Sequence, residues 1–231
     1  MAVVTGGSTG IGGACAAVLA ASGATVYAVS RSTDPAVDVR VPETLAALAD
    51  RVAQEHGRLD VLITSAGVLT ENRPADRATA EDFAENYEVN VVGTVNACQA
   101  FWPLLEAARG AVVCVSSQAA LVSLPAQAAY SASKGAVAAL TRSLAIDWAA
   151  AGVRVNAVAP GFTATPMIEG LLANPRLTAA LERRIPIGRV LDPAEIAYTA
   201  VFLASPAASA VTGVVLPVDG GWTAGEPALP W

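Results

Sequence analysis

The chain of 231 residues carries 14 basic and 20 acidic side chains, and 54% of its residues are hydrophobic. A net charge of −6 without a cluster of Lys or Arg argues against a nucleic-acid partner and against docking of an acidic carrier protein. No apolar run reaches the roughly 18 residues that a membrane span needs, and we expect no leader before the first strand. We therefore expect no membrane partner and a cytoplasmic location.

The sequence alternates between predicted strands and helices. In chain order we expect a strand at 2–5, a helix at 10–22, strands at 24–29 and 37–39, a helix at 43–55, a strand at 60–64, a largely helical stretch at 80–108 interrupted near Pro103, a strand at 111–115, a helix at 128–150, a strand at 153–158, a helix at 193–204 and a strand at 214–218. The strands are continuous apolar runs, which is typical of a parallel sheet buried on both faces.

This pattern predicts an α/β fold in which a doubly wound, Rossmann-like parallel sheet has helices on both faces, as a three-layer sandwich. We expect a single dinucleotide-binding and catalytic domain over 1–231, with a lid or small helical insertion at about 163–190. Only about seven residues separate the second strand from the third, too few for the usual crossover. The third strand is therefore expected to be short or displaced.

Metal and histidine chemistry is not expected. Cys15, Cys98 and Cys114 are odd in number, widely spaced and set in apolar runs, so we interpret them as buried free thiols. The single histidine, His56, lies at a predicted helix end. One histidine cannot supply a zinc site, and its position does not suit a catalytic triad.

A glycine-rich turn connects the first strand to the first helix. Gly6, Gly10 and Gly12 let the backbone turn sharply and approach a pyrophosphate, which the N–H groups at the helix N-terminus would bind. Ser8 and Thr9 add hydroxyls within reach of phosphate. Three glycines can also simply make a tight turn, but a strand before them and a helix after them favour phosphate binding.

Tyr130 and Lys134 stand four residues apart in an alanine-rich helix, so they share a face. A nearby cation stabilises phenolate and lowers the pKa of tyrosine, which suits a tuned acid/base. The alternative is a lysine that merely solubilises the helix. Ser117 supports the first interpretation because it ends a strand at the edge where open α/β sheets bind ligands, although Ser116 or Ser117 could instead cap a turn.

The spacing of "TGGSTGIG" and of "YSASK" resembles that of the short-chain dehydrogenase/reductase family, and the resemblance runs from the first strand to "VDGG" at 218–221. It implies a catalytic tetrad of Asn90, Ser117, Tyr130 and Lys134. It also implies hydride transfer between a nicotinamide and a carbonyl or carbinol carbon, and a homotetramer built through helices around 85–108 and 128–150. The cofactor contacts implied are Gly6, Ser8, Thr9, Gly10, Ile11, Gly12, Asp38, Val39, Ala66, Gly67, Tyr130, Lys134, Pro160, Gly161, Thr163 and Thr165.

Two positions depart from the family pattern. Thr64 and Ser65 replace the usual asparagines before Ala66 and Gly67, and both can still form hydrogen bonds. The short loop from Ser30 to Val37 leaves the adenine-side role of Asp38 open.

The end of the second strand favours NADP(H) over NAD(H). Ser30 occupies the position where an acidic residue would select NAD, and Arg31 follows it. A hydroxyl beside a guanidinium suits a 2′-phosphate. NAD(H) stays an alternative, because Arg31 could be solvated or stack on adenine and Asp34 lies close by.

The substrate is expected to be a small ketone or alcohol bound by Ser117, Gln118, Gln127, Tyr130 and Phe162. Leu124 and the lid residues 167–172 are further candidates. The leading hypothesis is an NADP-preferring dehydrogenase/reductase acting on a secondary alcohol or ketone. A 3-oxoacyl-carrier-protein reductase and a non-catalytic NAD(P)-binding sensor are the alternatives.

Overall fold

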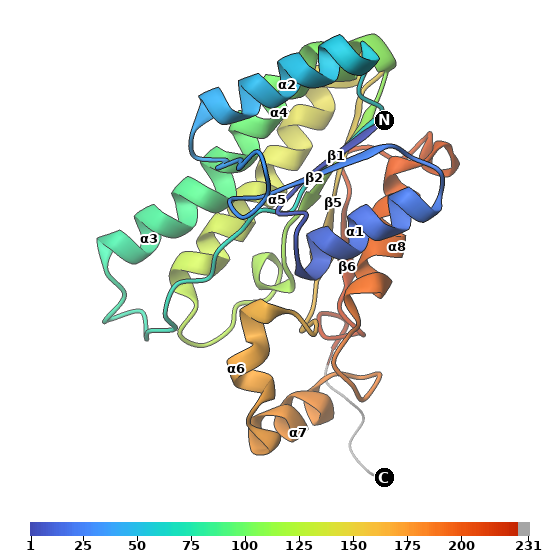
Figure 1. The fold of residues 1–231 in the computed structure, drawn as a ribbon. Coiled ribbons are helices and arrows are strands. Elements are labelled where there is room, and N and C mark those ends of the chain that lie inside the picture. The colour runs from blue at the N-terminus through green and yellow to red at the C-terminus, as the bar shows by residue number, and fades with distance from the viewer. Residues whose placement is uncertain (226–231) are drawn as a thin grey trace.

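The computed structural model describes residues 1–225, so the last residues of the expected 1–231 domain lie outside it. Six parallel strands form one sheet in the order β2-β1-β3-β4-β5-β6 (Figure 1). They are β1 Ala2–Thr5, β2 Val26–Val29, β3 Val61–Thr64, β4 Ala111–Val115, β5 Arg154–Pro160 and β6 Val215–Val218. β1, β3, β4 and β5 are almost wholly buried, which confirms the doubly wound parallel sheet.

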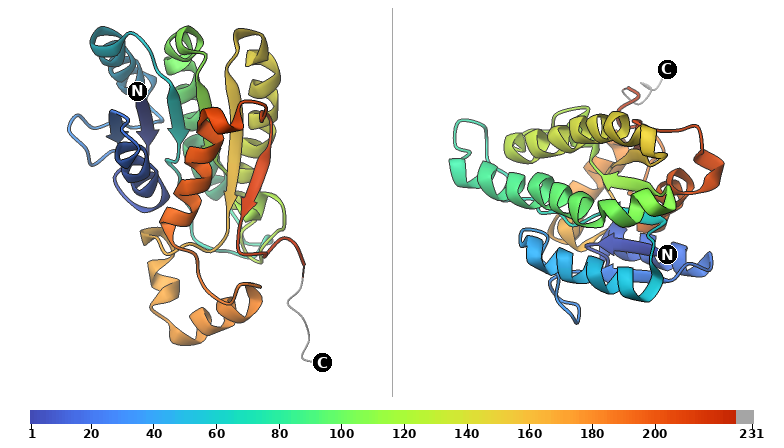
Figure 2. Two further views of the ribbon diagram at one scale, coloured as in Figure 1. Left: turned by 90° about the vertical axis from the view of Figure 1, so that its right-hand side faces the viewer. Right: turned by 90° about the horizontal axis from the view of Figure 1, so that it is seen from above.

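Helices cover both faces of the sheet (Figures 1 and 2). On one face α1, Gly10–Ala21, packs against α8, Pro193–Ala204. On the other lie α2, Pro42–His56, α4, Gly93–Ala108, and α5, Ala128–Trp148, with α3, Ala80–Tyr87, against α5. Short 3₁₀ turns occupy Gln118–Ala120, Ala149–Ala151, Pro166–Ile168 and Pro206–Ala208.

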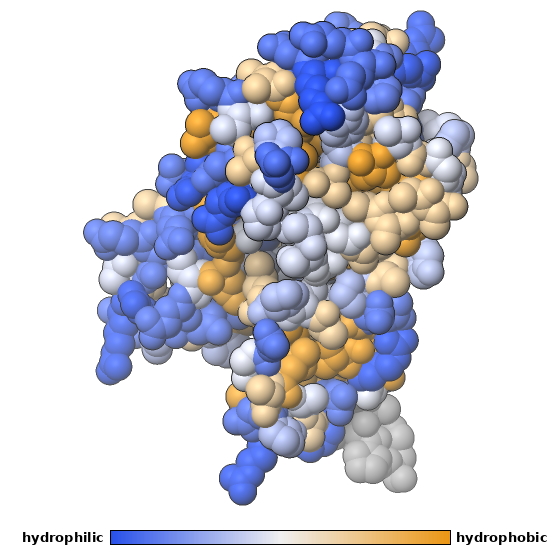
Figure 3. Space-filling model, in the orientation of Figure 1, coloured by the Kyte–Doolittle hydropathy of each residue, from blue (hydrophilic) through white to orange (hydrophobic). Residues whose placement is uncertain are grey.

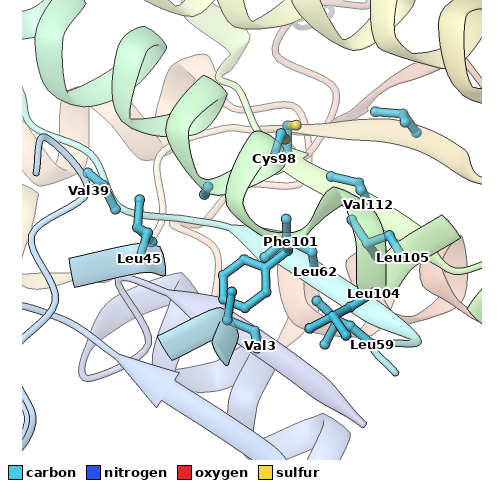
Figure 4. Packing of buried hydrophobic residues seen from close by; sticks show 14 of the residues in the cluster. Val3, Val39, Leu45, Leu59, Leu62, Cys98, Phe101, Leu104, Leu105 and Val112 are labelled. Carbon is cyan, nitrogen blue, oxygen red and sulfur yellow. The ribbon is translucent and has the colours of Figure 1, made fainter. Parts of the chain in front are cut away.

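Each face of the sheet has its own hydrophobic core. Leu19, Ile196 and Leu203 belong to the core between the sheet and the α1–α8 pair. On the opposite face, Phe101 of α4 lies beside Val3 and Leu62 of the sheet (Figure 4). The sheet is thus fixed from both sides, and its carboxyl edge is left to the loops that carry the site.

The expected strand at 37–39 does not form, and this prediction was wrong. Residues 30–41 run without a strand, because so short a connection cannot cross over and return parallel to β2. Val37 and Val39 bury their side chains in the α2–α4 core instead, at 3% and 6% exposure. Val39 is held by a hydrogen bond from Asn96 Nδ2 to its carbonyl and packs against Gly93.

The interruption of the 80–108 helix was placed wrongly. Pro103 lies inside α4, and the irregular turn is a π-helix at Glu88–Val92 between α3 and α4. A π-helix accommodates an extra residue per turn and occurs often at functional sites. Here it carries Asn90, whose side chain bonds to backbone outside the helix.

The stretch at 163–190 forms a small helical insertion at the carboxyl edge of the sheet (Figure 1). It contains α6, Glu169–Leu172, and α7, Pro175–Arg184. The Asn174 side chain caps α7 by accepting from Arg176 N and Leu177 N. None of the helices within 1–225 is both long and apolar enough to cross a membrane.

Candidate active site

A cavity of about 600 Å³ opens at the carboxyl edge of the sheet. Its wall is made by the loops that follow β1 to β5 and by the start of the insertion. In the space-filling view, hydrophobic surface gathers beside α6 and above α7, whereas the surface over α2 is hydrophilic (Figure 3). The wall includes the expected residues Gly6, Ser8, Thr9, Gly10, Ile11, Ser30, Arg31, Asp38, Val39, Ala66, Gly67, Ser117, Gln118, Leu124, Gln127, Tyr130, Lys134, Pro160, Gly161, Phe162, Thr163, Thr165, Met167 and Ile168.

The glycines of the first turn have different roles. Gly6 has φ +65°, and a Cβ there would lie 2.7 Å from Ala66 N. Gly12 does not line the cavity, and a Cβ on it would lie 2.2 Å from the Gly6 carbonyl oxygen. Gly12 therefore lets helix α1 pack against the turn, and Gly6 lets the turn pass the loop after β3.

The N-terminus of α1 is available to an anion. Thr9 is its N-cap and makes no capping hydrogen bond with its side chain, so the first N–H groups of α1 are not satisfied by that residue. Thr165, at the start of the insertion, comes close to Gly10: a Cβ on Gly10 would lie 3.3 Å from Thr165 Cγ2. This turn fits a dinucleotide pyrophosphate, because Thr9 leaves the first N–H groups of α1 uncapped and the turn residues line the cavity.

Tyr130 and Lys134 lie together one turn apart on α5, beside the end of β4. Lys134 is 5% exposed, its Nζ lies 5.8 Å from the centre of the Tyr130 ring, and it donates a 2.9 Å hydrogen bond to the Val115 carbonyl. A lysine that only solubilised the helix would point to solvent. The burial of Lys134 contradicts that alternative.

The two serines after β4 are used differently. Ser117 Oγ accepts from Ala119 N at 3.1 Å, as a cap of the following 3₁₀ turn, and it also lies near enough to the Tyr130 phenol to lower its pKa. Ser116 Oγ turns to α5 and donates to the Lys134 carbonyl at 3.0 Å. Ser117, and not Ser116, therefore faces the Tyr130 hydroxyl.

Asn90 lies behind the cavity wall and does not line it. Its Oδ1 accepts from Val68 N at 2.8 Å, and its Nδ2 donates to Val68 O and to Ser133 Oγ. A Cβ on Gly67 would lie 3.1 Å from Asn90 Oδ1 and 3.4 Å from Lys134 Nζ. Asn90 thus fixes the loop after β3 against α5, next to the lysine.

Burial shifts the pKa values of this pair. Desolvation raises the pKa of the Tyr130 phenol, and the hydrogen bond with Ser117 lowers it in part. Desolvation also lowers the pKa of Lys134 to about 8. The sequence led us to expect that the cation would lower the pKa of Tyr130. In the protein alone, burial has the larger effect, because both groups are withdrawn from water.

The loop after β2 forms the other end of the cavity. Ser30, Arg31 and Ser32 line it, and the Ser30 and Ser32 hydroxyls are 2.9 Å apart. Asp38 is paired with Arg40 through both carboxylate oxygens, at 3.0 and 2.6 Å. The hydrogen bonds from Arg40 hold the pKa of Asp38 at about 2.

Several lining residues were not identified from the sequence. Each of them lies within a few positions of a strand end or of an expected contact. They are Ser32, Val37, Ser65, Val68, Leu69, Val115, Ser116 and Pro166. The available signal was the rule that open α/β sheets bind ligands beyond strand carboxyl ends. Within residues 1–225 no cluster of three or more His, Cys, Asp or Glu could hold a metal ion, and the three cysteines are free and buried.

Comparisons with known proteins agree with this geometry. A family model described as "Enoyl-(Acyl carrier protein) reductase" matches residues 6–223. The chain is 42% identical to a cis-4-hydroxycyclohexanecarboxylate dehydrogenase of Sinomonas cyclohexanicum, over 97% of this chain and 96% of that protein. It is 39% identical to a D-threitol dehydrogenase of Mycolicibacterium smegmatis, over 96% and 92% of the two chains.

A solved structure shares the fold closely. A gluconate 5-dehydrogenase from Burkholderia cenocepacia in complex with NADP and tartrate matches with a TM-score of 0.91 and 30% identity, over 97% of this chain and 95% of that one. The fold, the cavity and these relatives define an NAD(P)-dependent oxidoreductase of alcohols and ketones. The chain belongs to the short-chain dehydrogenase/reductase family.

Proposed function

We propose that the protein interconverts a secondary alcohol and a ketone with Tyr130, Lys134, Ser117 and Asn90 as its catalytic and supporting groups. The observation that carries this proposal is the meeting of Ser117, Tyr130 and buried Lys134 at the carboxyl edge of β4, on the wall of one cavity. Cavities at that edge are where α/β sheets of this kind bind their ligands.

Each group has a distinct role in the proposed reaction. Tyr130 donates a proton to the carbonyl oxygen, or takes it from the carbinol, and Ser117 holds that oxygen by a hydrogen bond. Lys134 binds the nicotinamide ribose and holds positive charge near Tyr130. Asn90 positions the loop of Val68 against the helix of Lys134. When bound, the nicotinamide supplies or accepts the hydride.

NADP(H) is the cofactor that the loop after β2 supports better. This loop presents hydroxyls of Ser30 and Ser32 together with exposed Arg31, and Arg31 makes no ion pair with any residue in 1–225. The carboxylate of Asp38 is already neutralised by Arg40. A 2′-phosphate would thus meet hydroxyl donors and the guanidinium of Arg31, whose charge also acts on Asp38.

Arg31→Ala is expected to raise the Kd for NADPH about tenfold or more, and to change the Kd for NADH by less than twofold, because only NADPH carries the 2′-phosphate. Fluorescence titration with each cofactor measures this. Arg77→Ala removes another exposed arginine and serves as the matched control. Equal losses for both cofactors would show that Arg31 does not contact the phosphate.

The first test of the whole proposal is titration of the wild-type protein with NADPH and NADH, followed by turnover of simple ketones and alcohols. Tight NADPH binding with ketone reduction supports it. Tighter binding of NADH than of NADPH would show that the loop after β2 does not bind a 2′-phosphate. Binding without turnover of any ketone or alcohol would favour a sensor over an enzyme.

We further propose that the chain is a single domain in which residues 163–190 close over the substrate, and that it assembles as a homotetramer. We also propose a cytoplasmic location, because the free, buried cysteines suit a reducing compartment. Exposed apolar side chains on the supposed contact helices support assembly: Tyr87 and Ile146, and on α8 also Tyr198 and Phe202. Light scattering of the purified protein is expected to give four times the chain mass, and a monomer mass would refute the assembly.

A further inference from the structure

The two ends of the insertion are joined at its base. Leu191 N donates to the Phe162 carbonyl and Ala164 N donates to the Leu191 carbonyl, both at 2.9 Å. Phe162 lines the cavity at this base, and Met167 and Ile168 line it from the 3₁₀ turn that follows. The position of the insertion therefore sets the shape of one side of the cavity.

Trp222, in the turn after β6, contacts both the base and the far end of the insertion. The centre of its ring lies 5.1 Å from that of Phe162, with an interplanar angle of 60°. The guanidinium carbon of Arg184, the last residue of α7, lies 4.4 Å from the centre of the Trp222 ring. Trp222 is 8% exposed and does not line the cavity. It therefore supports Phe162 from outside the cavity.

The turn that carries Trp222 is fixed by its own hydrogen bonds. The Asp219 carboxylate accepts from Gly221 N and Thr223 N, both at 2.9 Å, and from Thr223 Oγ1 at 2.6 Å. A carbonyl of the same turn accepts from Ile187 N at 3.2 Å, which joins the turn to the segment after α7. The Trp222 ring is consequently held at a fixed place between β6 and the insertion.

The indole N–H of Trp222 takes no part in these contacts. Its Nε1 donates to no residue in 1–225, and a buried donor without a partner lowers stability. The contacts use the aromatic ring instead, because a cation lies over it and a second ring packs against it. The ring, and not the N–H group, is therefore the functional part of Trp222.

We propose that Trp222 is a positioning residue, which holds the Phe162 ring in the cavity wall and holds α7 in place through Arg184. This inference rests on the proposed function, because its consequence is for substrate binding in the cavity. Without the Trp222 ring, Phe162 is free to turn and the end of α7 loses its contact with the turn after β6. Substrate then meets a less well-formed wall, whereas Ser117 and Tyr130, on other elements, stay in place.

Trp222→Leu removes the ring and is tested with NADPH and three ketones: cyclohexanone, 2-butanone and acetophenone. We expect KM for the best ketone of the three to rise at least about fivefold, while kcat and the Kd for NADPH stay within about twofold, since only the wall is affected. Trp222→Phe keeps a ring without an N–H group and is expected to stay within about twofold of the wild-type KM. An unchanged KM or a loss confined to kcat in Trp222→Leu, or equal losses in the two variants, would overturn the positioning role.

Hydrogen exchange of the α7 amides measures the anchoring without turnover. With NADPH present, exchange over Pro175–Arg184 is expected to rise at least about fivefold in Trp222→Leu and in Arg184→Met, because each removes one partner of the same contact. Arg183→Met changes the exposed neighbour of Arg184 and is the matched control, for which wild-type exchange is expected. Wild-type exchange in either Trp222→Leu or Arg184→Met would overturn the anchoring.

The double variant Trp222→Leu with Arg184→Met distinguishes one shared contact from two separate ones. If the contact is shared, the second substitution changes exchange and KM by less than about twofold, and fully multiplied effects would overturn the coupling. If Trp222→Leu does not fold, Arg184→Met and Trp222→Phe still decide the question. Wild-type protein that binds NADPH but reduces none of the three ketones would overturn the proposed function, and the role of Trp222 in substrate binding with it. The exchange results would still decide whether Trp222 anchors α7.

Discussion

Tyr130→Phe removes one oxygen atom and is expected to lower kcat by about a thousandfold or more, while the Kd for NADPH changes by less than about threefold. The ring stays in place and the phenol O–H alone is lost, so the substrate oxygen loses its proton donor. Ser117 can still hold the substrate oxygen by a hydrogen bond, but it does not replace the phenol as the proton donor. Steady-state rates and cofactor titration on the same sample measure both quantities.

Tyr27→Phe is the matched control, because Tyr27 is half-buried on the edge strand β2 and its hydroxyl bonds to Glu55, outside the cavity. It is expected to keep wild-type kcat. Turnover retained by Tyr130→Phe would remove Tyr130 from the acid/base role. A parallel loss of NADPH binding would mean that the phenol holds the cofactor instead.

The raised pKa of Tyr130 gives the pH dependence a direction. Burial keeps the phenol protonated through neutral pH, so ketone reduction, which needs the acid, is lost only as pH rises through that raised pKa. Alcohol oxidation needs the base and is expected to increase with pH over the same range. From about pH 6 to about pH 10, below that raised pKa, the reduction rate is therefore expected to stay level and the oxidation rate to rise, and rate measurements in both directions test this difference.

The parts of the site that the sequence predicted are those whose chemistry follows from neighbouring residues. Tyr130 and Lys134 share a helix face because of their spacing, and Ser117 follows the buried strand β4. The glycine turn needed only the strand and helix around it. In each case a local rule placed the residue, and the parallel sheet then brought the strand ends together.

The parts that failed depend on contacts between distant segments. Nothing in "VDV" itself distinguishes a strand from a buried loop. The short connection after β2 prevents parallel pairing with β2, and contacts with Gly93 and Asn96 then hold Val39 in the core. The π-helix likewise follows from the bonds that Asn90 makes with Val68, 22 positions away. The role of Gly12 in packing appears only when the Gly6 carbonyl is placed beside it.

Lys134→Met is expected to lower kcat/KM by about a thousandfold and to weaken NADPH binding about tenfold, since both the ribose contact and the charge near Tyr130 are lost. In the protein alone, Nζ donates to Val115 O, and an ammonium has two further N–H groups for a ligand. Arg142→Met, on the exposed side of α5, is the control. Undiminished binding and rate in Lys134→Met would reduce Lys134 to a structural residue.

Lys134→Met is also expected to be more stable than the wild type. Because removal of a structural residue would lower stability instead, this result distinguishes a functional from a structural role of Lys134. Desolvation lowers the pKa of Lys134 from 10.5 to about 8, which corresponds to about 3 kcal/mol of destabilisation at neutral pH. Loss of the bond to Val115 O offsets about 1 kcal/mol, leaving a gain of about 2 kcal/mol in the free energy of unfolding.

The pH dependence of this gain has a definite sign. Between pH 8 and pH 10.5 the unfolded chain holds the Lys134 proton and the folded protein has released it, so wild-type stability rises with pH relative to the variant. The advantage of Lys134→Met is therefore full below about pH 8 and shrinks as pH rises above it. Urea unfolding at pH 7 and pH 10, roughly the two ends of that window, measures the difference. If Lys134 served packing alone, Lys134→Met would be less stable than the wild type at both pH values. If its buried charge is kept for the reaction, Lys134→Met is more stable than the wild type but inactive.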